Sequence, residues 1–180
     1  MKKTLVLLGV LSASLGAYAQ GTLNFSSFAT GVNAPVTNAA GVKIVASTGN
    51  YVADLFWSNT TNAPTDSLTA AGFNVPFSTL TLSGGGYFLG GARTINGASG
   101  QIEAQVRVWD LSKGATYDLA KQVGIDYGAS SSFVFTLALN PSPAAAMLGL
   151  QGFQLVVPEP GTFALAGLGA AALLIFRRRK

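Results

Sequence analysis

The sequence predicts a mainly β protein, an antiparallel β-sandwich or jelly-roll-like domain over residues 20–156. The first observation is the segment 101–110, QIEAQVRVWD, in which Ile, Ala and Val alternate with Gln, Glu and Arg. A period of two residues is typical of a strand with one buried face and one solvent-facing face. The second observation is a series of short runs rich in Val, Ile, Thr and aromatic residues, separated by clusters of Gly, Asn, Ser and Pro. About seven or eight short strands with such punctuation favour a sandwich.

The individual elements follow in chain order. Strands are expected at 22–28, 43–46, 51–57, 79–82, 86–89, 101–110, 132–139 and 153–157. The run Gly84-Gly85-Gly86 predicts a turn or a bulge, since glycine adopts a positive φ without strain. One short helix is expected at 116–123, where Thr116 can cap the first turn and Gly124 can end the helix in the left-handed conformation.

The domain has no disulfide, because the chain contains no cysteine. A domain of this size can bury an adequate core without cross-links. Its stability must therefore come from the packing of apolar and aromatic side chains, Trp57 and Trp109 among them.

The first 19 residues have the pattern of a secretory signal peptide. Lys2 and Lys3 form a basic start, and an apolar run follows at 5–15. Ala17 and Ala19 then form the small-residue pattern at which signal peptidase cleaves. We expect the mature chain to begin at Gln20.

The segment 157–180 is expected to be a membrane-associated tail in three parts. Pro158, Glu159 and Pro160 begin it, and the two prolines exclude helix interior and central strand. An uncharged stretch at 161–176 follows and is expected to be a transmembrane helix of roughly 24 Å, which is marginal for a bilayer core of roughly 30 Å. Four cations end the chain and are expected to act as a stop-transfer signal: Arg177, Arg178, Arg179 and Lys180.

This order of features resembles the PEP-CTERM sorting domain of Gram-negative bacteria. The resemblance rests on Pro158-Glu159-Pro160, the apolar helix and the basic end at 177–180. It implies that an exosortase-type membrane enzyme recognises the tail and that the protein, after a transient stop in the inner membrane, reaches the cell surface, outer envelope or extracellular matrix. The alternative interpretation is an ordinary membrane anchor with a proline-rich stalk.

The charge of the chain is dominated by its two ends. The formal net charge is +4, but six of the 11 cations lie in the signal peptide and the basic tail. The rest of the chain is slightly acidic and carries no cluster of cations. Because nucleic-acid binding requires clustered cations on the folded part, we expect no nucleic-acid partner.

The residue types of the chain favour a protein that is not an enzyme. Without histidine or cysteine, nucleophilic triads, thiolate chemistry and histidine-based metal sites are excluded. A pair of carboxylates across a cleft remains possible in principle, but no pair stands out among the acidic residues. The even spacing of Asp110, Asp118 and Asp126 suggests calcium, yet turn and capping roles explain each residue. We therefore predict no catalytic residue, no metal and no cofactor.

Two classes of function remain. The first is a structural protein of the cell surface or extracellular matrix, associated with exopolysaccharide or biofilm. The second is a carbohydrate-binding module delivered by the same route, in which Trp57, Tyr87 and Tyr117 would offer aromatic faces to a sugar ring. The alternative for these three aromatic residues is a role in the core.

Overall fold

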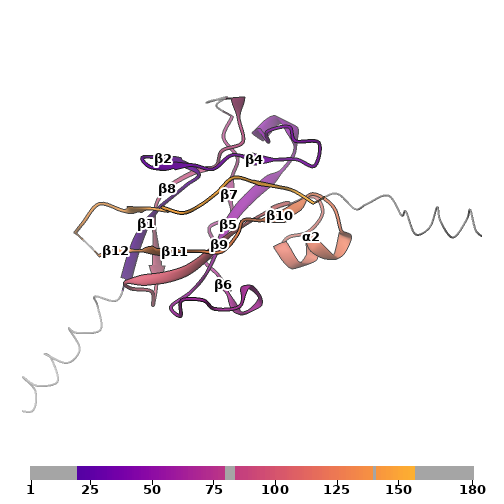
Figure 1. Ribbon diagram of the computed structural model, residues 1–180. Helices are drawn as coiled ribbons and strands as arrows, with labels where there is room; N and C mark the ends of the chain where they lie inside the picture. Colours follow the sequence, from indigo (N-terminus) through magenta and orange to yellow (C-terminus); the bar gives the residue numbers. More distant parts are fainter. Residues whose placement is uncertain (1–19, 80–83, 140, 157–180) are drawn as a thin grey trace, which may run out of the picture.

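The computed structural model describes residues 20–79, 84–139 and 141–156, which form antiparallel sheets and one α-helix (Figure 1). The prediction of a mainly β domain is confirmed. The first sheet contains β1 (Gln20–Ser26), β8 (Leu89–Asn96), β12 (Ala138–Leu139) and β13 (Ala145–Ala146). The second contains β5 (Tyr51–Ser58), β6 (Thr69–Ala70), β7 (Val75–Pro76), β9 (Gln101–Asp110), β10 (Tyr127–Ala129) and β11 (Phe133–Thr136).

The first sheet is built on β1. β8 pairs with it antiparallel along one edge, from Gln20 opposite Asn96 to Ser26 opposite Leu89. β12 pairs antiparallel and β13 pairs parallel with β1. A second parallel pair joins β14 (Phe153–Gln154) to β4 (Val36–Thr37), and β2 (Phe28–Ala29) pairs antiparallel with β3 (Val32–Asn33). The arrangement is therefore antiparallel with two short parallel contacts.

The second sheet is built on the antiparallel pair β5 and β9. These strands match the expected segments, and their register runs from Tyr51 opposite Asp110 to Ser58 opposite Glu103. β6 and β7 continue the sheet beyond β5, and β10 and β11 continue it beyond β9. Each outer edge is thus made of two short strands, and the sheet places β5 and β9 at its centre.

One apolar cluster, the main core, joins the two sheets. Phe25 of β1 is completely buried, with its ring centroid 5.2 Å from that of Phe73 and 4.8 Å from that of Phe88. The inward residues of the central strands contribute Ala53, Leu55, Ile102, Ala104, Val106 and Val108. Two sheets that share one core have the layering of a sandwich.

The other face of β9 differs from the prediction of a solvent-facing side. Glu103 is 4% exposed and Gln105 is 8% exposed. A second core covers this face, and it consists of Val52, Phe56, Leu68, Trp109, Tyr117 and Ala120. The prediction was wrong because polar residues on a strand do not show whether a helix or loop will cover them.

Three polar residues under this cover have hydrogen-bond partners, whereas the buried Trp109 Nε1 has none among the described residues. Glu103 Oε2 accepts from the Asn62 N–H at 2.8 Å, and Gln105 Nε2 donates to the Ser130 carbonyl at 2.9 Å. Arg107 Nε donates to Gln105 Oε1 at 2.8 Å. Buried polar groups are tolerated when they are paired in this way, so β9 holds the surrounding loops in place.

Two strand predictions were wrong. The segment 43–46 contributes only an isolated bridge between Thr37 and Lys43, because Thr48 Oγ1 bonds the backbone of Val45 and starts a 3-10 turn at Ala46–Thr48. The strand expected at 86–89 instead runs over Leu89–Asn96 as β8. Gly90 lies at a β-bulge of this strand, where a Cβ atom would be 2.7 Å from the Phe25 carbonyl oxygen.

The glycine run 84–86 is irregular, as predicted. All three residues have positive φ, between 85° and 90°. The Gly86 N–H donates to the Ile44 carbonyl, and the Gly86 carbonyl accepts from the Val36 N–H. Gly86 is therefore bonded to both of these segments. The preceding strand, expected at 79–82, lies almost entirely outside the described residues.

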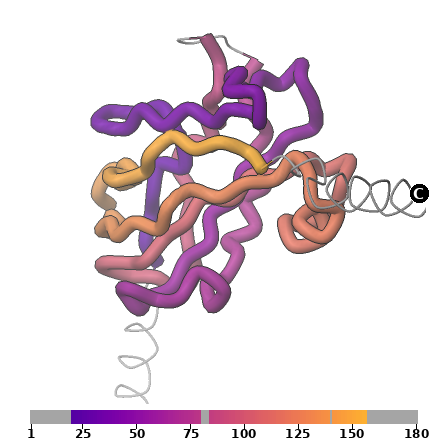
Figure 2. The backbone as a smooth tube through the Cα atoms, turned by 45° about the vertical axis from the view of Figure 1, so that its right-hand side comes forward, coloured from indigo at the N-terminus to yellow at the C-terminus, as the bar shows by residue number. Residues whose placement is uncertain are grey.

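The predicted helix is confirmed as α2 (Tyr117–Val123). Thr116 Oγ1 accepts from the Leu119 N–H at 3.4 Å, and Gly124 has a φ of 85° and donates to the Ala120 carbonyl. The helix is amphipathic, because Tyr117 and Ala120 face the second core while the residues between them are exposed. Its position against the second sheet is visible in Figure 2.

Substitution of the helix cap should have a modest cost. We expect Thr116→Ala to lower the free energy of unfolding by about 0.5–1 kcal/mol, because the Leu119 N–H in the first turn loses its acceptor. The cost is modest because this hydrogen bond is long, at 3.4 Å. Denaturant unfolding measures the effect. Thr116→Ser keeps the hydroxyl and should behave like the unaltered protein; an equal loss in both variants would contradict the capping role.

Candidate functional site

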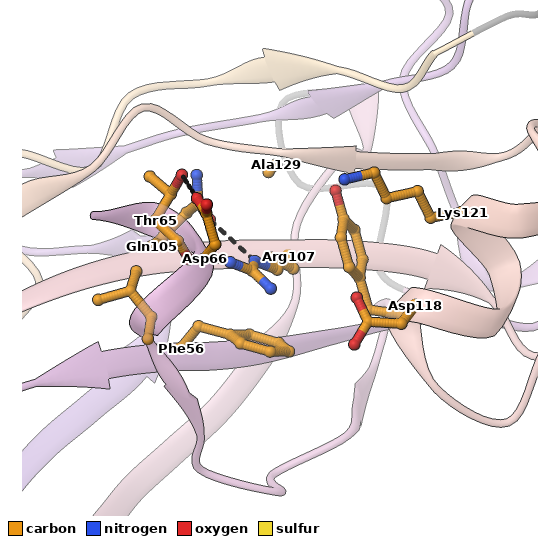
Figure 3. A pocket seen from close by; sticks show the side chains of 10 residues that line it. Phe56, Thr65, Asp66, Gln105, Arg107, Asp118, Lys121 and Ala129 are labelled. Atoms are coloured by element: carbon orange, nitrogen blue, oxygen red, sulfur yellow. Dashed lines mark hydrogen bonds between the residues drawn. The ribbon is translucent and has the colours of Figure 1, made fainter. Parts of the chain in front are cut away.

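The second core opens at its edge into a pocket of about 300 Å³ (Figure 3). Its lining comes from the second sheet, from the 3-10 turn at Thr65–Ser67 and from α2. We call it the Arg107 pocket; it is lined by Phe56, Thr65, Asp66, Leu68, Gln105, Arg107, Tyr117, Asp118, Lys121 and Ala129. Figure 3 shows Arg107 between the residues of the turn on one side and the two charged residues of α2 on the other.

Arg107 is placed by strand alternation and held by its neighbours. It projects to the same face of β9 as Glu103 and Gln105. The guanidinium carbon lies 3.9 Å from the ring centroid of Phe56 and 5.1 Å from that of Tyr117. Arg107 Nη2 also donates to the Thr65 carbonyl. Stacking on an aromatic ring and two hydrogen bonds keep this cation in one orientation.

The pocket's electrostatics follow from this burial. Burial lowers the pKa of Arg107, whereas Tyr117, Asp118 and Asp66 act in the opposite direction. Burial likewise raises the pKa of Tyr117, an effect that the nearby Arg107 reduces. Both groups are therefore in a medium less polar than water, where a charged or hydrogen-bonding ligand interacts more strongly.

The rim carries both signs of charge. Asp66, Asp118 and Lys121 are exposed, and Asp66 Oδ1 accepts from the Thr65 hydroxyl at 3.2 Å. Together with Arg107, two cations and two carboxylates surround the opening. A polar ligand with both acceptors and donors suits such a rim better than an apolar one.

The other acidic residues have structural partners. Asp54 Oδ1 accepts from the Phe73 N–H at 2.7 Å and its Oδ2 accepts from the Gly72 N–H at 3.0 Å. Asp110 Oδ1 accepts from the Ser112 N–H, and Asp126 Oδ1 accepts from the Tyr51 hydroxyl. Across the described ranges, no three acidic residues are grouped so that they could hold a metal ion.

The three aromatic residues considered for sugar binding lie in different places. Trp57 is partly buried against the main core and borders a separate hollow of about 250 Å³. Tyr87 is buried, and its hydroxyl donates to Asn33 Oδ1 at 2.8 Å. Tyr117 lines the Arg107 pocket. The structure therefore does not bring them together into one platform.

Arg107 and Lys121 were not singled out in the sequence, although both line the pocket. Their only signal was an arginine on the polar face of an alternating strand and a lysine in the last turn of the predicted helix. That signal is weak because exposed strands and helices carry such residues routinely. The pocket arises only when α2 and the 59–68 segment fold over β9.

The folded part ends next to the sorting residues. The Val156 N–H donates to the Tyr127 carbonyl at 2.7 Å, and the Leu155 N–H donates to the Thr37 carbonyl at 2.8 Å. The sorting residues Pro158, Glu159 and Pro160 and the basic residues 177–180 lie outside the described residues, as do Ala17 and Ala19. Gln20, the expected first residue after signal cleavage, is the first residue of β1.

None of the helices within 20–79, 84–139 and 141–156 is long and apolar enough to cross a membrane. The helix expected at 161–176 falls beyond these ranges and stays a prediction.

Comparison with known proteins gives one match. Residues 156–180 match the family model described as the PEP-CTERM protein-sorting motif. No curated protein and no solved structure matches the chain. The matched segment begins at Val156, the last described residue, and covers all of the expected tail. The chain thus carries a PEP-CTERM protein-sorting motif, which implies an exported protein that is handled at the membrane and processed by an exosortase.

Proposed function

We propose that the β-domain is a non-enzymatic structural component of the cell surface or extracellular matrix, where it associates with exopolysaccharide. The observation that carries the proposal is the sorting motif at 156–180, joined directly to the last hydrogen-bonded residue of the fold. With Val156 bonded to Tyr127, a single residue separates the domain from Pro158. Processing at this tail would leave the whole β-domain as the delivered product.

A structural role also agrees with the chemistry of the domain. Histidine and cysteine do not occur in the sequence. The buried acids Asp54 and Glu103 accept hydrogen bonds from loop backbone and therefore stabilise the fold. Acid–base catalysis needs a titratable group that reaches a substrate, and these two carboxylates are committed to the protein itself.

Replacement of the sorting residues tests the route. We expect the triple substitution Pro158→Ala, Glu159→Ala and Pro160→Ala to abolish tail processing in a host that contains an exosortase, because the enzyme loses its recognition segment. Mass spectrometry of the C-terminus and cell fractionation measure the outcome. The altered chain should keep its tail and stay with the membrane fraction.

A matched control separates recognition from general damage. Pro64→Ala changes an exposed proline far from the tail and should leave processing intact. A triple variant that is cut and exported like the unaltered protein would refute the sorting route. The triple variant could also stay in the membrane while the unaltered protein releases its mature domain into the medium. That result would support export by the sorting route but reject retention at the cell surface.

The second candidate function is carbohydrate binding, and the Arg107 pocket favours it. The pocket combines an aromatic wall from Phe56 and Tyr117 with several hydrogen-bonding groups. Sugar recognition uses the same combination of apolar faces and oriented polar groups. In this alternative the sorting tail would deliver a binding module to the matrix.

A further inference from the structure

Arg107 is a cation that forms no ion pair within the described residues. Its side chain has five N–H donors, and the described residues accept from Nε and from Nη2 only. No carboxylate in the described part of the chain forms an ion pair with it. A half-buried guanidinium is costly unless it is paired, so the free donors at the pocket are available to a ligand.

The neighbouring acids do not fill this role. Asp54 lies directly opposite Arg107 in the register of β5 and β9, but its carboxylate accepts from the Gly72 and Phe73 N–H groups instead. Asp66 and Asp118 line the same pocket at the rim, within reach of solvent. Asp54 therefore bonds a loop, and Arg107 lines the cavity.

The cation is also fixed before a ligand arrives. Its position over the Phe56 ring and its bonds to Gln105 and Thr65 restrict its rotamers. Planar guanidinium groups bind carboxylates through two parallel hydrogen bonds, and a prearranged group loses less entropy on binding. An anion with a flat, forked acceptor, a carboxylate, is the ligand group that this geometry favours.

The other polar groups of the pocket can form hydrogen bonds with hydroxyl groups next to the ligand carboxylate. Tyr117 lines the pocket, and its hydroxyl has no hydrogen-bond partner among the described residues. Asp118 and Asp66 offer acceptors to ligand hydroxyls, and Lys121 offers a donor. A volume of about 300 Å³ is at the lower end of the range for small-molecule sites, which suits a single sugar ring better than a larger ligand.

We propose that the Arg107 pocket binds a uronic acid residue of an acidic polysaccharide, with the sugar carboxylate on Arg107 and the ring hydroxyls on Tyr117, Asp118 and Asp66. The inference rests on the second candidate function and names its ligand class. Binding requires the sugar hydroxyls as well as the carboxylate, since an anion without hydroxyls would be repelled by the two carboxylates at the rim and would form no compensating hydrogen bond with them. The ligand enters from the open side of the pocket, between α2 and the Thr65–Ser67 turn.

Calorimetric titration of the purified full chain in detergent tests the proposal. The probes are glucuronate, a glucuronate oligomer, neutral glucose, dextran and acetate. We expect binding of glucuronate and its oligomer, weakening with added salt, and none of glucose, dextran or acetate. Binding of the oligomer alone would identify the polymer, rather than a free sugar acid, as the source of the ligand.

Three variants link binding to the pocket. Arg107→Lys keeps the charge but loses the fork and should weaken glucuronate binding about tenfold or more. Tyr117→Phe keeps the ring in the second core and should weaken it about threefold to tenfold. Arg93→Lys, a change of the same kind at an exposed site on β8, should leave binding unchanged.

Two results of these titrations would contradict binding of a uronic acid at the Arg107 pocket. Absence of binding of both glucuronate and its oligomer at millimolar concentration, or equal binding by the Arg107→Lys and Arg93→Lys variants, would overturn the proposal. Because Arg107→Lys removes a bond to the Thr65 carbonyl, its thermal unfolding is measured in parallel; if that variant does not fold, Tyr117→Phe alone decides. Tail processing is assayed separately, so a failure of sugar binding leaves the sorting route intact.

Discussion

Phe25→Ala should lower the free energy of unfolding by about 4 kcal/mol, the largest effect expected from a single change in the domain. Phe25 has no exposed surface and lies on β1, at the centre of the first sheet. Its ring packs against Phe73 and Phe88, so truncation leaves a cavity between the sheets that rigid strands cannot close. Urea unfolding followed by tryptophan fluorescence measures the change.

A second phenylalanine provides the control. Phe28 is only three residues further along the chain, yet it is 40% exposed, and its ring centroid lies 5.1 Å from that of the buried Tyr87. We expect Phe28→Ala to cost about 1 kcal/mol or less. Similar losses in both variants would show that the main core does not depend on packing around Phe25.

Asp54→Ala should lower the free energy of unfolding by about 3 kcal/mol. The carboxylate is 2% exposed and accepts hydrogen bonds from the Gly72 and Phe73 N–H groups. Alanine would leave these donors unpaired in the 71–74 segment, where Asn74 already has a positive φ of 45°. Each buried donor without a partner costs about 1–3 kcal/mol, which sets the expected size.

Two further variants refine the interpretation of this loss. Asp54→Asn keeps one acceptor oxygen and should lose about half as much stability. Asp66→Ala removes an exposed acid that accepts only from the Thr65 hydroxyl, and should change stability by roughly 0.5 kcal/mol or less. If Asp54→Ala cost no more than Asp66→Ala, the carboxylate would not be the element that holds the loop.

The same residue should make stability depend on pH. Burial raises the pKa of Asp54, while the N–H groups of Phe73, Gly72, Leu55 and Asn74 pull it back. The folded protein therefore binds the proton of the Asp54 carboxyl more tightly than the unfolded chain does. The contribution of this proton to the free energy of unfolding is complete below the unfolded pKa of about 4 and is lost as the pH rises through the folded pKa. Asp54→Asn should remove this part of the pH dependence.

The sequence predicted those elements whose signals are local. The strand at 101–110 alternates because one of its faces is in the main core, and the helix at Tyr117–Val123 has its cap and its glycine end in the sequence itself. β8 was largely missed because an edge strand is exposed on both faces and therefore lacks alternation. Its Gly90 is required by the nearby Phe25 backbone, a contact about 65 residues away that no local pattern reveals.

The candidate site was less predictable than the fold. Tyr117 was considered for binding, but Arg107 and Lys121 resembled ordinary surface cations in the sequence. The pocket forms only where α2 and the Thr65–Ser67 turn meet β9, and Asp54, which lies opposite Arg107 in the register, bonds a loop instead. Neither the covering of β9 by these two elements nor the bonding of Asp54 to a loop has a local sequence signature.

The sequence by itself carries the sorting motif of this protein, because a sorting enzyme reads a short linear segment, and the match at 156–180 confirms that segment. It also determined the β class and the central strands, since side-chain period is a local property. The tertiary structure alone decided that the polar face of β9 is covered, that the three aromatic residues are separated, and that Arg107 lines a cavity. These features depend on contacts between distant segments, whose free energies are set by packing and desolvation in three dimensions.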